Sequence, residues 1–227
     1  MPRLARTSRL LAATAVALVV LTSASAASAC SGGGYGYAGL IGADPSRGVR
    51  ATVSAVSLPR VDSGHAAAWV GVGGPGAGPD GENEWIQVGL AAYQGSSLRL
   101  YYEVMRGTRR DYVEVDSNVA AGEGHRVAVT EVGGSPGWWR ATVDGRSVTD
   151  PVYLAGSHRA WRPVVTAENW RADCEPNAFR FRFRRVEVRG GRWSRMLQPF
   201  VLEDGSFRLL KWSRGFDALA GAAARTL

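Results

Sequence analysis

The segment 85–89, with the sequence Trp-Ile-Gln-Val-Gly, holds a glutamine in the middle of an expected β-strand. In a strand of period two, Trp85, Gln87 and Gly89 share one face, while the apolar residues between them face a core. Glutamine is not favoured in strands, and its amide needs hydrogen-bonding partners. An amide between an indole and a glycine therefore indicates a surface that can receive a ligand.

The chemistry open to this amide depends on a carboxylate opposite it. We expect the scaffold to set Gln87 opposite Glu168, which lies in the segment 164–170 (Val-Val-Thr-Ala-Glu-Asn-Trp). A carboxylate can take a proton from a water molecule and later return it. A neutral amide can orient that water and donate a hydrogen bond to an oxyanion. Such a pair needs no metal ion and no serine or cysteine nucleophile.

Short strands dominate the chain after residue 47 and must position these two side chains. The run 179–184 alternates Phe and Arg, which predicts phenylalanines in a core and arginines on a solvated face. Many short strands separated by Gly-, Pro- and Asp-containing turns predict an all-β fold, an antiparallel jelly-roll β-sandwich of the concanavalin or glucanase type. The strands are expected at 50–57, 67–72, 84–92, 97–106, 111–116, 125–132, 138–143, 162–170 and 178–189.

The first 29 residues are typical of an export signal. Arginines precede an apolar run at 10–21, and a small-residue cleavage site follows at 27–29 (Ala-Ser-Ala). The apolar run is too short for a membrane span, and no later segment is apolar enough to be one. We therefore expect a secreted, extracellular protein whose mature chain begins at Cys30.

The chain is expected to divide into four parts around a single domain. These are a signal peptide at 1–29, a flexible lead-in at 30–47, a β-sandwich at 48–190, and a C-terminal hairpin and tail at 191–227 packed on the sandwich. The hairpin would join 200–202 to 207–210. The alanine-rich end from Ala218 is expected to fray or to form a short helix.

The sequence holds two cysteines, Cys30 and Cys174. We predict a disulfide that ties the N-terminus to the loop just beyond Glu168, with a stabilisation of about 4–5 kcal/mol in the chain-entropy model. The alternative is a lipid anchor at Cys30. Ala27 argues against the anchor, because a lipoprotein signal prefers a larger aliphatic residue there.

Charge and motifs exclude several classes of function. The net charge of +7 falls to +4 once the three signal arginines are removed, which is too small for a nucleic-acid binder. The three histidines have no metal-ligand spacing, so no metal site is expected. The glycine string at 71–76 contains Pro75 and cannot open a helix that would hold a dinucleotide. We expect no cofactor, no nucleic-acid partner and a monomer.

Four segments, in their order along the chain, resemble the eqolisin family of glutamic peptidases, which are secreted jelly-roll enzymes. In that family, strands like Trp-Val-Gly-Ile-Asp-Gly and Ile-Leu-Gln-Thr-Gly precede an aromatic-rich Trp-Tyr-Glu-Trp strand, and a catalytic Glu closes a later aliphatic strand. The likeness spans about residues 51–188 and includes 179–188 as the closing strand. The matching segments are 69–74 (Trp-Val-Gly-Val-Gly-Gly), 85–89, 101–104 (Tyr-Tyr-Glu-Val) and 164–170.

The resemblance implies hydrolysis of peptide bonds in a polypeptide substrate by a Gln87/Glu168 dyad. Gly73 and Ala91 depart from the pattern, because fungal members carry acidic residues there. Two carboxylates in one cleft repel each other when both are charged, so Glu103 near Glu168 would favour activity below neutral pH. The residues that the resemblance assigns to substrate binding are Trp69, Trp85, Tyr101, Glu103 and Trp170.

The alternative function is a non-catalytic jelly-roll module that binds carbohydrate or peptide at the cell surface. Its exposed Trp and Tyr rings would stack on sugar rings, and it predicts a shallow, open aromatic platform. The hydrolase predicts instead that the amide of Gln87 and the carboxylate of Glu168 face one cavity. A structural cell-surface protein, suggested by Cys30 if it is lipidated, is a third interpretation.

Overall fold

A computed structural model describes residues 34–171, 177–221 and 223 of the 227-residue chain. The expected export signal, Cys30 and Cys174 lie outside the described residues, so the signal and the disulfide stay predictions. No helix among the residues described is both long enough and apolar enough to cross a membrane.

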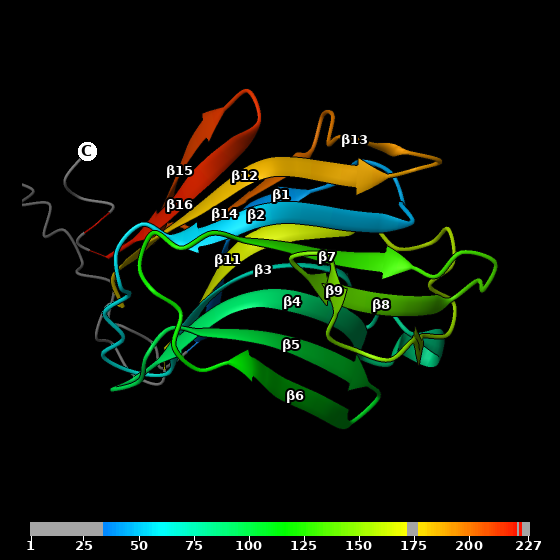
Figure 1. The fold of residues 1–227 in the computed structure, drawn as a ribbon, viewed down its shortest axis with the longest axis horizontal. Coiled ribbons are helices and arrows are strands. Elements are labelled where there is room, and N and C mark those ends of the chain that lie inside the picture. The colour runs from blue at the N-terminus through cyan, green and yellow to red at the C-terminus, as the bar shows by residue number, and fades with distance from the viewer. Residues whose placement is uncertain (1–33, 172–176, 222, 224–227) are drawn as a thin grey trace, which may run out of the picture.

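Two antiparallel sheets pack face to face, which confirms the predicted β-sandwich (Figure 1). The first sheet has seven strands in the order β14-β1-β11-β3-β4-β5-β6. Its strands are β1 (Gly34–Ile41), β3 (His65–Gly74), β4 (Glu84–Tyr93), β5 (Arg99–Arg106), β6 (Arg109–Asp116), β11 (Pro163–Arg171) and β14 (Phe200–Glu203).

The second sheet has nine strands, with β10-β8-β7-β2-β12-β16-β15 as its main path. The short strands β13 and β9 pair with β12 and β8. A 3-10 turn at Pro79–Gly81 lies between β3 and β4. The strands are β2 (Gly48–Ala55), β7 (His125–Glu131), β8 (Trp138–Val143), β9 (Arg146–Ser147), β10 (Val152–Tyr153), β12 (Phe179–Arg189), β13 (Trp193–Arg195), β15 (Phe207–Trp212) and β16 (Gly215–Ala220).

The expected flexible lead-in at 30–47 instead contains β1. This strand pairs with β11 along its whole length and with β14 at its end, so it lies inside the first sheet. One of the glycines that suggested a loop, Gly39, is required by close packing. A Cβ on Gly39 would lie 2.2 Å from the carbonyl oxygen of Val165 on β11.

The C-terminal region also differs from the expected hairpin. Segments 200–203 and 207–212 join different sheets, β14 beside β1 and β15 beside β16. Of the alanine-rich end from Ala218, expected to fray or form a short helix, residues 218–220 instead belong to β16, which lies between β12 and β15, while residues 222 and 224–227 lie outside the described residues. Small side chains suit this position because neighbouring phenylalanines fill the space around them, including Phe183 stacked on Phe216 at 4.5 Å.

The core lies between the two sheets and follows the strand alternation. From β12, Phe179, Phe181 and Phe183 point inward and are at most 1% exposed, as their spacing predicted. From the first sheet, the inward residues are small or aliphatic, such as Val70 and Val88, both fully buried. Burial of each large side chain contributes roughly 1.5–3 kcal/mol. Because side chains alternate along each strand, the residues between these point away from the core, and the outer face of the first sheet can form a binding site.

Glu131 is a buried charge that ties loops at one end of the second sheet. Its side chain is 1% exposed and contacts Arg47 at 3.1 Å and His158 at 2.6 Å. It also accepts a hydrogen bond from the backbone N–H of Gly137 at 2.8 Å. Burial alone would raise the pKa of Glu131, but these three partners outweigh burial and lower it.

Replacing Glu131 with Gln should lower the free energy of unfolding by about 2–3 kcal/mol at neutral pH, because bonds to a charged group are lost. The pKa of Glu131 is depressed in the fold, so this contribution is complete above the ordinary value of about 4.5 and is lost as pH falls further. Urea unfolding at pH 7 and pH 3 measures both effects.

Glu114→Gln is the control, because Glu114 forms a surface pair with Arg99 and should change stability by at most about 1 kcal/mol. Two results would contradict the stabilising role of the Glu131 carboxylate. One is a Glu131→Gln variant as stable as wild type at pH 7, and the other is an equal loss of stability at both pH values.

Candidate active site

A cavity of about 440 Å³ lies on the outer face of the first sheet. Strand alternation creates its floor: on β3, His65, Ala67 and Trp69 point into the cavity, while Ala66 and Ala68 between them are buried in the core. Side chains from β1, β4, β5, β6, β11 and β14 complete the lining.

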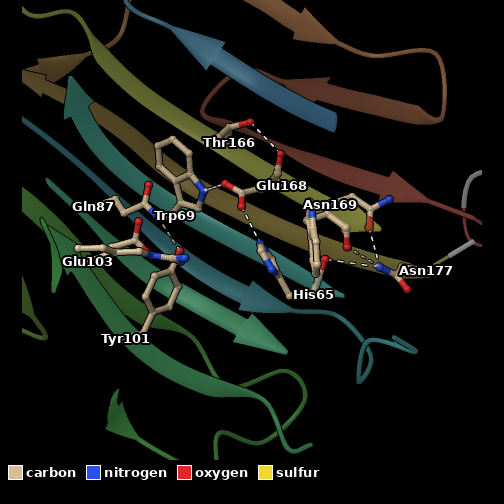
Figure 2. A network of polar contacts seen from close by, with 12 residues as sticks. His65, Trp69, Gln87, Tyr101, Glu103, Thr166, Glu168, Asn169 and Asn177 are labelled. Atoms are coloured by element: carbon tan, nitrogen blue, oxygen red, sulfur yellow. Dashed lines mark hydrogen bonds and ion pairs between the residues drawn. The ribbon is translucent and has the colours of Figure 1, made fainter. Parts of the chain in front are cut away.

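Glu168 of β11 has its carboxylate in this cavity and is 8% exposed. Nε2 of His65 lies 2.7 Å from Oε1, and the indole Nε1 of Trp69 donates to Oε2 at 3.0 Å (Figure 2). A carboxylate has about four lone-pair sites. Two donors, one on each oxygen, therefore leave room for a water molecule or a substrate group.

Gln87 of β4 lines the same cavity and is also 8% exposed. Its Nε2 donates a hydrogen bond to the hydroxyl of Tyr101 at 3.1 Å. Burial, together with the charges of Glu168 and Glu103, raises the pKa of Tyr101 well above its ordinary value. Tyr101 therefore keeps its proton, and its O–H can donate to a third group.

The sheet register relates the two side chains. On β3, Glu168 pairs with Ala67 and Gln87 pairs with Gly71, so one row of the sheet separates them on this face. In a flat sheet, their Cα atoms would be about 10 Å apart across the strands and about 13 Å along them. They share a cavity without direct contact.

The row between them is built from Thr166, Trp69, Gly89 and Tyr101 on neighbouring strands. Both end groups reach toward this row, since Glu168 bonds to Trp69 and Gln87 bonds to Tyr101. Gly89 lies between the two aromatic residues and has no side chain. The part of the cavity lined by Trp69 and Tyr101 is therefore where a reacting group could meet both the carboxylate and the amide.

Glu103 of β5 is the second carboxylate of the cavity and is 3% exposed. It accepts hydrogen bonds from the indole of Trp85 at 2.9 Å and from Arg110 at 2.6 and 2.8 Å. Burial would lower the pKa of Arg110, but the bond and charge of Glu103 outweigh it and raise it. Arg110 therefore offsets the repulsion between carboxylates that the sequence led us to expect.

Six of the seven residues named from sequence line the cavity. Trp170 is not among the lining residues and instead stacks against His65, with ring centroids 5.8 Å apart. Gly73 and Ala91, where an acidic residue was noted as absent, also border the cavity. The six are Trp69, Trp85, Gln87, Tyr101, Glu103 and Glu168.

Sequence reasoning missed His65, Tyr37 and Arg110. His65 lies four residues before Trp69, so strand periodicity could have placed it on the same face. Tyr37 pairs with Glu168 from β1, and burial followed by the charge of Glu168 raises its pKa. The pairing of β1 with the distant β11 reveals Tyr37 as part of the site, and the β5–β6 hairpin brings Arg110 to Glu103.

Within residues 34–171 and 177–221, no group of three or more His, Cys, Asp or Glu side chains could hold a metal ion. The cavity instead offers carboxylates, one amide, indole N–H groups and tyrosine hydroxyls. These groups can accept a proton, orient water and donate to a developing negative charge.

No family profile and no curated protein sequence matches the chain. Solved structures do match, and three of them each share 16% sequence identity over 85% of this chain and 100% of the other. Two are scytalido-glutamic peptidase, with a peptide-based transition state analog (TM-score 0.58) and with a transition state analog inhibitor (TM-score 0.59). The third is SCP-B, an eqolisin peptidase in complex with the tripeptide Ala-Ile-His (TM-score 0.55). At this identity, the likeness shows a shared β-sandwich fold.

Replacing Gly89 with Ala should destabilise the sheet at the site. The new Cβ would lie 2.0 Å from the carbonyl oxygen of Ala68 and 2.6 Å from Cα of Trp69, so β3 and β4 must separate. We expect the free energy of unfolding to fall by about 1–3 kcal/mol, measured by urea unfolding.

Gly74→Ala is the matched control, because a Cβ on Gly74 would have no atom within 4 Å. It should change stability by less than about 0.5 kcal/mol. Equal stability of the two variants would show that β3 and β4 do not approach as closely as described.

Proposed function

We propose that this protein is a glutamic-type endopeptidase that hydrolyses peptide bonds with Glu168 and Gln87. The observation that supports this function best is one cavity holding a nearly buried carboxylate and a nearly buried amide, both directed at the row through Gly89. The fold shared with solved glutamic peptidases and the motif order along the chain add further support.

In the first step, Glu168 acts as general base. It takes a proton from water, and the resulting hydroxide oxygen bonds to the carbonyl carbon of the peptide. The carbonyl π electrons move to its oxygen, which becomes an oxyanion. The N–H of Gln87 stabilises this charge, and the protonated hydroxyl of Tyr101 beside it can donate as well.

In the second step, the protonated Glu168 returns its proton to the peptide nitrogen. The carbon–nitrogen bond then breaks, the oxyanion re-forms a carbonyl, and the products are a carboxylic acid and an amine. Glu168 ends the cycle as it began, so no metal ion or covalent intermediate is needed.

The cavity walls suit an extended polypeptide. Trp69 and Trp85 contribute aromatic faces on either side of the Gln87 region, and their N–H groups are engaged by Glu168 and Glu103. These hydrogen bonds hold the indoles in place and do not involve the amide of Gln87. A substrate would pack its side chains on these rings while its backbone passes between Glu168 and Gln87.

Non-catalytic binding of peptide or carbohydrate is the second candidate. Its support is the aromatic lining, which includes Tyr35, Tyr37, Tyr93 and Tyr112 in addition to the residues already named. This function would retain ligand affinity without any bond cleavage, so the same assay separates the two candidates.

The test is cleavage of an unfolded protein by the purified mature chain across acidic and neutral pH. Glu168→Gln should abolish detectable cleavage, because the proton acceptor is gone. Gln87→Ala should lower kcat by roughly 100- to 1,000-fold, because an oxyanion donor is lost. Mass spectrometry of the fragments measures both.

Glu187→Gln is the control, since this carboxylate lies in β12 of the other sheet and pairs with Arg50. It should cleave like wild type. Equal cleavage by all four proteins would point to a contaminating protease and would contradict a catalytic role for Glu168 and Gln87. Substrate binding by the wild type without cleavage at any pH would favour the binding module.

A further inference from the structure

We infer that His65 is a positioning residue that holds the Glu168 carboxylate in its reactive orientation, a role that rests on the proposed peptidase function. His65 is the nearest charged or titratable partner of Glu168, with 2.7 Å between Nε2 and Oε1. An ionised carboxylate only accepts hydrogen bonds, so Nε2 carries the proton and donates.

The imidazole ring is held by aromatic side chains from three other strands. It stacks on Trp170 of β11 with an interplanar angle of 30° and lies 5.6 Å from the ring of Tyr93 on β4. Tyr35 of β1 approaches it edge-on at 6.2 Å. The side chain of His65 is 12% exposed as a result. These contacts fix the direction in which Nε2 points.

The backbone that leads into His65 is fixed as well. Asn177 donates to the carbonyl of Ser63 at 2.9 Å and accepts hydrogen bonds from the N–H groups of Asp62 and Ser63. Its Nδ2 also lies 2.7 Å from Oδ1 of Asn169 on β11 (Figure 2). One buried amide therefore ties the turn before His65 to the strand that carries Glu168.

Gly64 completes this support. Its φ of +68° suits glycine, and a Cβ there would lie 2.2 Å from the carbonyl oxygen of Trp170. The turn can thus pack directly on β11. The contacts of the ring, the turn and β11 together hold His65 where it donates to Oε1 of Glu168.

This bond acts with that from Trp69 to set the rotation of the carboxylate. Each oxygen receives one N–H donor from β3, so the carboxylate plane is fixed at two points. The remaining lone pairs then face a defined region of the cavity. A misplaced catalytic group can lower the rate on the order of 100-fold, so the loss of one point should reduce kcat.

Two variants separate the donor from the ring. His65→Phe keeps the aromatic stack but has no N–H, whereas His65→Gln loses the ring but can present an amide N–H near the position of Nε2. We expect His65→Phe to lower kcat on the order of 10- to 100-fold with KM changed less than about twofold, and His65→Gln to recover most of kcat.

NMR of ¹⁵N-labelled histidine in the intact chain provides a readout independent of cleavage. The Nε2 signal of His65 should shift in Glu168→Gln, because a neutral amide replaces the carboxylate that accepts its proton. An unchanged His65 signal would overturn the pairing even in an active enzyme, and it stays decisive if His65→Phe fails to fold.

The kinetic outcomes distinguish this inference from the proposed function. An active wild type with an unchanged kcat in His65→Phe would overturn the role of His65 and leave the peptidase intact. A wild type that cleaves nothing would overturn both. A loss of kcat in His65→Gln that is absent in His65→Phe would assign the effect to the ring rather than the hydrogen bond, which also overturns the inference.

Discussion

The site depends on a charge that the fold must keep satisfied, the carboxylate of Glu168 at 8% exposure. A buried carboxylate is costly unless hydrogen-bond donors replace the water that it loses. Both donors, His65 and Trp69, come from β3, the strand beside Glu168 in the sheet. A shift of one residue in this register would send both donors to the core face. The antiparallel pairing of β3 and β11 is therefore the constraint on which the chemistry rests.

A second consequence of the register is the row that separates Glu168 from Gln87, which runs through Thr166, Trp69, Gly89 and Tyr101. Trp69 and Tyr101 flank this glycine, and each binds one of the two groups assigned to catalysis. The sheet thus separates the acid and the amide while directing both toward the same space. Such an arrangement leaves room for a bound group between the carboxylate and the amide, which do not contact each other directly.

Strand periodicity predicted much of the fold, because alternation is a local property. The Phe-Arg alternation of 179–184 and the apolar residues around Gln87 placed their strands and buried faces correctly. Periodicity failed at β1 and β16, where glycine and alanine resemble a loop or a helix. At Gly39 of β1 and Gly215 of β16 a side chain would run into the backbone of the neighbouring strand, and that is visible only in the packed sheet.

The site was predictable to the extent that its residues share a strand or a family motif. His65 could be inferred from its spacing to Trp69, but its partner Glu168 lies 103 residues away. The neutralisation of Glu103 by Arg110 depends on the pairing of β5 with β6. The stacking of Trp170 on His65 likewise depends on β3 and β11 being adjacent, so its role as support was not evident from sequence.

A crystal structure of the chain with a peptide-based transition-state analog would test the central claim most directly. The account predicts that the tetrahedral centre binds between Glu168 and Gln87, with its oxygens within about 3.2 Å of both the Glu168 carboxylate and the Gln87 amide. An analog bound in the cavity with either of these groups out of hydrogen-bonding distance would contradict the account.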